Sequence, residues 1–169
     1  TAQALLAIVS AAYAVYHGPK GIKKIAETVS QLTKNFADKL KQSGYELYSD
    51  DFFDTITVKT LDKTDKIYKN ALDQGVNIRK VNSELLAVSF DERKNLYRAN
   101  QLLKIFNCSE TIKETMNESL SNLPKKLLRS SSYLDHPVFN SYHSETEMLR
   151  YLKRLEDSDI ALNRTMIAL

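Results

Sequence analysis

The feature that most constrains the fold is a long amphipathic helix, which the sequence predicts over Ile22 to Ser43. Its apolar side chains recur at the i, i+3, i+4 and i+7 positions that share one face of a helix: Ile22, Ile25, Ala26, Val29, Leu32, Phe36, Ala37 and Leu40. Gly44 follows as a stop signal. The apolar stripe of such a helix has to be covered, so we expect the rest of the chain to supply a layer against it.

A shorter helix is predicted directly before it, over Ala2 to Tyr16. This segment is apolar on nearly all sides and carries no charge, which is typical of a buried helix. It is too short for a bilayer span, which needs about 20 apolar residues, and it lacks the basic lead of a signal peptide. Gly18 as a left-handed C-cap and Pro19 are expected to end the helix, with His17 interacting with its last carbonyls.

Two pairs of strands then follow, each pair followed by a helix. Strands are predicted at Tyr45–Tyr48, Phe52–Lys59, Val76–Val81 and Leu85–Phe90, and helices at Asp62–Gln74 and Asp91–Phe106. The three residues between the last two strands, Asn82 to Glu84, are of hairpin size. This order predicts an α+β fold: a small antiparallel-rich sheet covered by helices, followed by a mostly helical and extended C-terminal tail.

The character of the chain changes after Asn107. A further helix is expected over Cys108 to Leu120, and a surface connector over Pro124 to Ser132. Ser144 lies three residues before Glu147, the spacing of a capping box, at the start of a helix that runs to Glu156. The residues from Ile160 to Leu169 are expected to be mostly extended.

Composition excludes several kinds of site. Cys108 is the only cysteine, which excludes a disulfide framework and a cysteine metal cluster. The chain has 4 glycines, none of them in a phosphate-cradling loop. A net charge of +3 does not demand nucleic acid as a partner. The lysines of the long helix also lack the aromatic ladder that single-strand binding uses.

Five residues remain as candidates for a functional role: His17, His136, Tyr142, His143 and Arg164. Each also has a structural interpretation. His17 can end a helix, and His136 is held extended by the proline that follows it. Tyr142 can lie at the entry to a helix, and His143 can make a contact where two segments cross. Arg164 can form an ion pair on the surface. The sequence predicts no catalytic, cofactor-binding or metal-ligating residue on this chain.

Several stretches of the chain follow a familiar sequence pattern. In the C-terminal part these are Ser132–Asn140, Tyr142–Tyr151, Leu155-Glu156, Asp159, Ala161–Arg164 and Met166-Ile167. Nearer the N-terminus they are Thr1–Ala7, Tyr13–Gly18 and Phe52–Thr55. In these stretches the chain closely resembles the glycine cleavage system P-protein family, the pyridoxal-phosphate-dependent glycine decarboxylases. The resemblance spans the whole chain in one register. Ala168 departs from the pattern, because proline is commoner there in the family.

The resemblance implies a position inside a long, duplicated enzyme whose halves each have the shape of a fold-type I pyridoxal-phosphate enzyme. Residues 1–120 then belong to the small C-terminal domain of the first half, 121–143 to a connector, and 144–169 to the opening of the second half. In that family the Schiff-base lysine and most cofactor contacts lie in the large domain of the second half. Pyridoxal phosphate is therefore expected in the parent enzyme and not on this chain.

The implied activity is that of an oxidoreductase, glycine dehydrogenase (decarboxylating), of which this chain alone is expected to be inactive. The cofactor is an electron sink for the carbanion left by loss of carbon dioxide. The aminomethyl group passes to the lipoyl arm of the H-protein. The implied partners are the rest of the P-protein, lipoylated H-protein and glycine, in a dimeric parent, with no nucleic acid and no membrane. The implied location is the cytoplasm in bacteria or the mitochondrion in eukaryotes.

Two other functions stay open. One is a free-standing α+β interaction module that docks through the helix Ser144 to Glu156, and the other is nucleic-acid binding through the lysines. A start without methionine and an uncapped apolar end, Met166 to Leu169, favour an excised piece of a larger protein. The tail from Phe139 to Leu169 is then expected to be poorly packed or borrowed by a neighbouring molecule.

Overall fold

The computed structural model describes residues 2–93, 96–113 and 123–166, which fall into two compact units. The central unit holds residues 25–129, and the terminal unit holds residues 1–24 with 130–169. The boundary at Lys24 lies inside the longest helix, α1 (Ala2–Gln42), so this helix contributes to both units.

Helix α1 is broken at the predicted position. Gly18 has φ 61° and ψ 179°, a backbone region that essentially only glycine adopts. The helix resumes at once with Pro19, because proline is tolerated in a first helical turn, where an N–H would have no partner. The first helical segment therefore ends where predicted, and the second begins at Pro19, before its predicted start at Ile22.

The central unit is built on a four-stranded antiparallel sheet in the order β1-β2-β4-β3. The strands are β1 (Glu46–Leu47), β2 (Thr55–Lys59), β3 (Arg79–Lys80) and β4 (Leu85–Ser89). In the β2–β4 pair, Ile56 lies opposite Val88 and Val58 opposite Leu86, which sends these four side chains to one face. The predicted α+β class and antiparallel sheet are confirmed.

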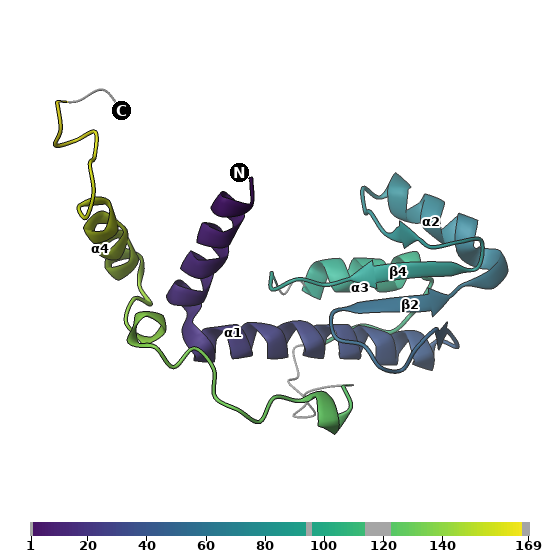
Figure 1. The fold of residues 1–169 in the computed structure, drawn as a ribbon. Helices are drawn as coiled ribbons and strands as arrows, with labels where there is room; N and C mark the ends of the chain where they lie inside the picture. Colours follow the sequence, from purple (N-terminus) through teal and green to yellow (C-terminus); the bar gives the residue numbers. More distant parts are fainter. Residues whose placement is uncertain (1, 94–95, 114–122, 167–169) are drawn as a thin grey trace. The chain divides into compact units, whose positions relative to one another are not determined.

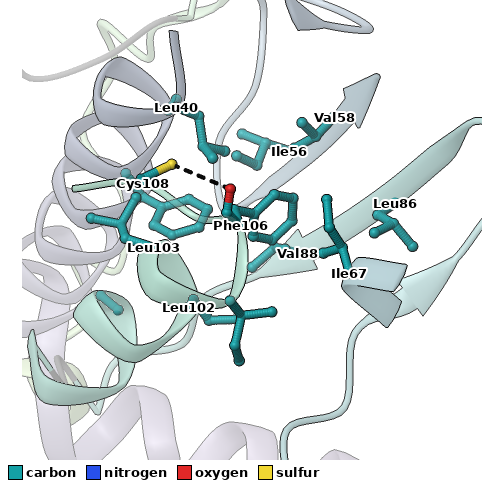
Figure 2. Packing of buried hydrophobic residues seen from close by; sticks show 14 of the residues in the cluster. Leu40, Ile56, Val58, Ile67, Leu86, Val88, Leu102, Leu103, Phe106 and Cys108 are labelled. Carbon is teal, nitrogen blue, oxygen red and sulfur yellow. Dashed lines mark hydrogen bonds between the residues drawn. The ribbon is translucent and has the colours of Figure 1, made fainter. Parts of the chain in front are cut away.

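Three helical segments cover that face of the sheet (Figure 1): the second part of α1, α2 (Thr64–Asp73) and α3 (Leu96–Ile105). A 3-10 turn, η1 (Leu61–Lys63), leads into α2. Figure 2 shows apolar side chains from β2, β4 and the helices meeting in one core. Burying a side chain such as Leu or Phe contributes about 1.5–3 kcal/mol, so the predicted stripe of α1 anchors this unit.

The start of the last predicted helix lies partly outside the described residues. The Oδ1 of Asp91 accepts a hydrogen bond from the backbone N–H of Arg93 at 3.1 Å, a bond to the second following residue that Asx turns and helix caps share. Residues 91–93 are non-helical, residues 94–95 lie outside the described residues, and α3 is described from Leu96 onward.

The helix expected over Cys108 to Leu120 is not formed over residues 108–113; the remainder of that range lies outside the described residues. Instead, the amide side chain of Asn100 pairs with both backbone groups of Ile112, accepting from N–H at 2.7 Å and donating to C=O at 3.2 Å. This pairing holds the segment in an extended course. The connector then contains a short 3-10 turn, η2 (Lys125–Leu127).

The terminal unit contains the first part of α1, a 3-10 turn η3 (Pro137–Asn140) and helix α4 (Glu145–Glu156). Helix α4 has the predicted start and end, and none of its residues is buried. None of the described helices combines the length and hydropathy that a membrane span requires.

The predicted burial of the helix from Ala2 to Tyr16 was wrong for this chain. The side chains of Leu5, Leu6 and Ile8 are each 65% exposed, and that of Val9 is 55% exposed. Only near the break is the segment covered, where Val15 is 5% exposed. The apolar pattern was identified correctly, but the described residues of the terminal unit offer too little surface to cover it.

Candidate functional site

The structure places one candidate residue, His143, directly against the break in α1. Its Nδ1 lies 2.9 Å from the carbonyl oxygen of Tyr16. This carbonyl belongs to the last turn before the break, where helix acceptors are left without intrahelical donors. With the proton on Nδ1, His143 caps that turn, which is the predicted crossing contact.

Gly18 is buried beneath residues 133–143, the crossing segment that carries His143. A Cβ at this position would lie 2.7 Å from Cε1 of His143 and 2.7 Å from the carbonyl oxygen of Phe139. The hydroxyl of Tyr133 donates a hydrogen bond to the carbonyl of Pro19 at 2.7 Å. Contacts from residues 133–143 therefore fix the break on both sides, a feature that sequence reasoning missed.

The other two histidines take structural positions. The ring of His17 packs against those of Tyr13 (4.3 Å between centroids) and Tyr16 (5.1 Å). The predicted hydrogen bond from His17 to the last carbonyls of its helix is not found among the described residues. His136 is extended, with φ −62° and ψ 138°, and its Nδ1 accepts a hydrogen bond from the N–H of Val138 at 3.2 Å.

Tyr142 lies just before α4 and stacks on an aromatic ring of that helix. Its ring lies parallel to that of Tyr151, with centroids 4.3 Å apart and an interplanar angle of 13°. The guanidinium of Arg154 lies 5.3 Å from one ring and 5.5 Å from the other, and it donates to the Tyr142 hydroxyl. Exposed cation–π contacts contribute about 0.5–1 kcal/mol. The spacing of Tyr151 and Arg154, three residues apart on one helix, could have signalled this cluster.

Arg164 contacts the backbone of the residues that follow the C-terminus of α4. Its guanidinium donates hydrogen bonds to the carbonyl oxygens of Asp157 (2.6 Å) and Asp159, and its Nε lies 3.8 Å from the Asp157 carboxylate. A cation is favourable there because the C-terminus of a helix carries partial negative charge. The predicted ion pair is present. Over residues 160–166 the predicted extended course is interrupted, since the N–H of Arg164 closes a turn onto the carbonyl of Ala161 at 3.1 Å. Residues 167–169 of that prediction lie outside the described residues.

Helix α4 starts with the predicted capping box. The Oγ of Ser144 accepts a hydrogen bond from the N–H of Glu147 at 3.3 Å. In return, the carboxylate of Glu147 accepts from the hydroxyl of Ser144 at 2.9 Å and from its N–H at 3.1 Å. These bonds, that of the hydroxyl first, lower the pKa of Glu147 because they favour its ionised form.

We expect this capping box to weaken in acid. A lowered carboxyl pKa stabilises the folded helix above the unfolded value of about 4.3, and that contribution is lost as the pH falls through the folded pKa. Ser144→Ala should raise the pKa of Glu147 and cost the helix about 1 kcal/mol at neutral pH. An NMR titration of Glu147 checks both effects, with Thr146→Ala as the matched control. A Glu147 pKa that Ser144→Ala leaves unchanged would argue against the capping contact.

The single cysteine lies in the core of the central unit. Cys108 is buried, and its Sγ is 3.9 Å from the carbonyl oxygen of Phe106 (Figure 2). Burial raises the pKa of this thiol, and a hydrogen bond with Ser43 offsets the rise only in part. Burial and then the nearby Cys108 likewise raise the pKa of Tyr45. A neutral, buried thiol is a packing group rather than a nucleophile.

Alkylation should therefore modify Cys108 slowly in the folded chain. We expect a rate at least about tenfold below that of the denatured chain at neutral pH. Because the folded pKa is raised, the neutral thiol stabilises the fold below the unfolded value of about 8.5, and this contribution is lost as the pH rises above it. Ser109→Cys in a Cys108→Ala background is the exposed control. Equal rates for the two positions would contradict burial.

Three described cavities are lined by lysines, whereas pyridoxal phosphate needs a free lysine amine and a phosphate cradle. In a cavity of about 500 Å³, the Nζ of Lys39 lies 3.1 Å from the carboxylate of Glu110 and 3.0 Å from the amide oxygen of Gln42. A smaller cavity of about 210 Å³ places Lys63 over the ring of Tyr45. In a third, of about 110 Å³, the Nζ of Lys59 lies 3.0 Å from the carboxylate of Glu46. Lys39 and Lys59 are therefore held in ion pairs rather than offered as free amines. Among the described residues, no three or more His, Cys, Asp or Glu side chains cluster as metal ligands.

Known proteins match the chain along its whole length. A family model described as glycine cleavage system P-protein matches residues 1–106. The chain is 91% identical over 169 residues to glycine dehydrogenase (decarboxylating) of Pelagibacter ubique. It is 46% identical to the proteins of the same name from Aliivibrio fischeri, over 174 residues, and Photobacterium profundum, over 175. Each alignment covers 100% of this chain and 18% of the relative.

Proposed function

Since this chain belongs to the glycine cleavage system P-protein family, we propose that it is a non-catalytic portion of a pyridoxal-phosphate-dependent glycine decarboxylase. The full enzyme decarboxylates glycine and passes the aminomethyl group to the lipoyl arm of the H-protein. One observation carries the proposal: 91% identity across the entire chain to a relative of which it spans only 18%. A free-standing interaction module would not be expected to align in this way.

Within that enzyme, residues 1–120 form the small domain of the first half, 121–143 the connector, and 144–169 the opening of the second half. The small domain's task is to help close the active-site cleft and exclude water. The antiparallel sheet, with one face packed against helices, supports this role. The seam between the halves is fixed by His143 against the break in α1.

No residue of this chain is assigned to catalysis, cofactor binding or metal binding. The structural contacts of His17, His136, Tyr142, His143 and Arg164 support that assignment. The cofactor belongs to the rest of the P-protein, which is also the first partner of this chain. Lipoylated H-protein and glycine are partners of the whole enzyme, which we propose to be a dimer. Because the matched relatives are bacterial, the proposed location is the cytoplasm.

The activity is tested with the full-length enzyme and glycine labelled at its carboxyl carbon. We expect labelled carbon dioxide to be released when pyridoxal phosphate and lipoylated carrier protein are both present, and not with unlipoylated carrier. The isolated 169-residue chain should release none. Two results would contradict the proposal. One is release of labelled carbon dioxide by the isolated chain, and the other is release by the full-length enzyme that is the same with and without lipoylation of the carrier.

A further inference from the structure

The first part of α1, from Ala2 to His17, presents an apolar surface to solvent. Its large side chains spread over one broad side of the helix, at about 3.6 residues per turn. Leu5, Val9 and Tyr16 lie along the middle of that side, and Leu6 and Ile8 flank it. Burying each of these would contribute about 1.5–3 kcal/mol, so their exposure forfeits a stabilisation that is large for a single helix.

The opposite side of this segment is uncharged as well. It carries small side chains instead of polar ones: Ala4, Ala7, Ala11 and Ala14. Apart from the tyrosine hydroxyls and His17, the only polar side chains of the segment are Gln3 and Ser10. A surface helix of a globular protein has a polar side, whereas a helix that is apolar all round is buried.

Helix α4 of the same unit shows the contrast. Its leucines Leu149, Leu152 and Leu155 are about half exposed, as in the first part of α1. However, α4 carries six charged side chains on the rest of its circumference: Glu145, Glu147, Arg150, Lys153, Arg154 and Glu156. The charged side of α4 is suited to water, and its leucine side is suited to contact with a partner. The first part of α1 has no side suited to water.

We propose that the segment Ala2 to His17 is an internal helix of the full-length protein, covered by apolar surface of the same polypeptide from outside these 169 residues. The aligned relatives contain this segment within chains of which it and the other matched residues make up only 18%. The rest of the polypeptide is therefore the surface available to cover it. This inference rests on family membership and not on the proposed activity.

Two other ways of covering the segment Ala2 to His17 fit less well. A second copy of the chain, packed helix against helix about a two-fold axis, covers one side of each segment and leaves the other in water. A membrane span needs about 20 apolar residues, and no described helix meets the requirements of one. Only a surrounding protein interior covers both the leucine side and the alanine side.

The test is photo-crosslinking in the full-length protein, with Ile8→p-benzoylphenylalanine. Irradiation should give a product of monomer mass in which the peptide around position 8 is joined to a peptide outside the 169 residues. Ser83→p-benzoylphenylalanine, in the exposed turn between β3 and β4, is the matched control and should give no such product. A crosslink within the 169 residues, a product of doubled mass, or no crosslink at position 8 would each overturn the proposal.

A second measurement needs no substitution. In hydroxyl-radical footprinting of the unmodified full-length protein, Leu5, Leu6, Ile8 and Val9 should oxidise at least about tenfold more slowly than in the denatured protein, because a packed interior excludes solvent. Rates equal to those of the denatured protein would overturn the proposal. A full-length enzyme that decarboxylates glycine but shows these rates would leave the proposed function standing.

Discussion

Replacing Gly18 by alanine is expected to destabilise the contact between the crossing segment and α1 by about 2–6 kcal/mol. Two costs combine. The backbone at φ 61° and ψ 179° is strained for any residue with a Cβ. That Cβ would also lie 2.7 Å from both His143 and the carbonyl of Phe139, closer than packed atoms approach, so the crossing segment has to move away.

Amide hydrogen exchange measures this effect locally. In Gly18→Ala, protection should fall for the residues around Phe139 and His143, and the His143 ring signals should shift as the hydrogen bond to Tyr16 is lost. Gly44→Ala is the matched control, because Gly44 has φ 87° but no atom within 4 Å of an added Cβ. It incurs the backbone strain alone, about 1–2 kcal/mol. Equal effects at the two glycines would show that the close approach at Gly18 is not real.

Phe36→Ala is expected to lower the free energy of unfolding of the central unit by about 3–5 kcal/mol. The side chain is 0% exposed, and its ring makes edge contacts with Phe90 (5.1 Å) and Phe106 (6.2 Å). Alanine would remove these contacts and leave a cavity between α1 and the sheet. Since a domain of this size is stable by about 5–15 kcal/mol in all, the loss is a large fraction of the total.

Urea unfolding of the chain, followed by tyrosine fluorescence and circular dichroism, measures this loss as a fall in the midpoint. The control is Tyr97→Ala, on α3 of the same unit but 74% exposed, which should change stability by no more than about 0.5 kcal/mol. If Phe36→Ala and Tyr97→Ala gave the same midpoint, the predicted stripe of α1 would not be the anchor of the core.

The parts of the fold that the sequence predicted are those with local or periodic causes. The stripe through Phe36 follows the helical period, and the alternation through Leu86 and Val88 follows the strand period. The capping box needs only Ser144 and Glu147, three positions apart. Each of these signals is contained in a few neighbouring residues, so no knowledge of the rest of the molecule was needed.

The parts that could not be predicted depend on distant residues. The contact of His143 with Tyr16 joins positions 127 apart, and neither side chain is unusual in its own surroundings. The composition of the helix before Gly18 showed that it must be covered, but not whether its cover lies in this chain.

We propose that the full-length enzyme binds pyridoxal phosphate through a part of the polypeptide outside these 169 residues. Borohydride reduction of the full-length holoenzyme, followed by peptide mapping, tests it most directly. We expect one phosphopyridoxyl-lysine per subunit, in a peptide outside these 169 residues. Stoichiometric label on any lysine of this chain, for example Lys39 or Lys63, which line described cavities, would contradict this proposal.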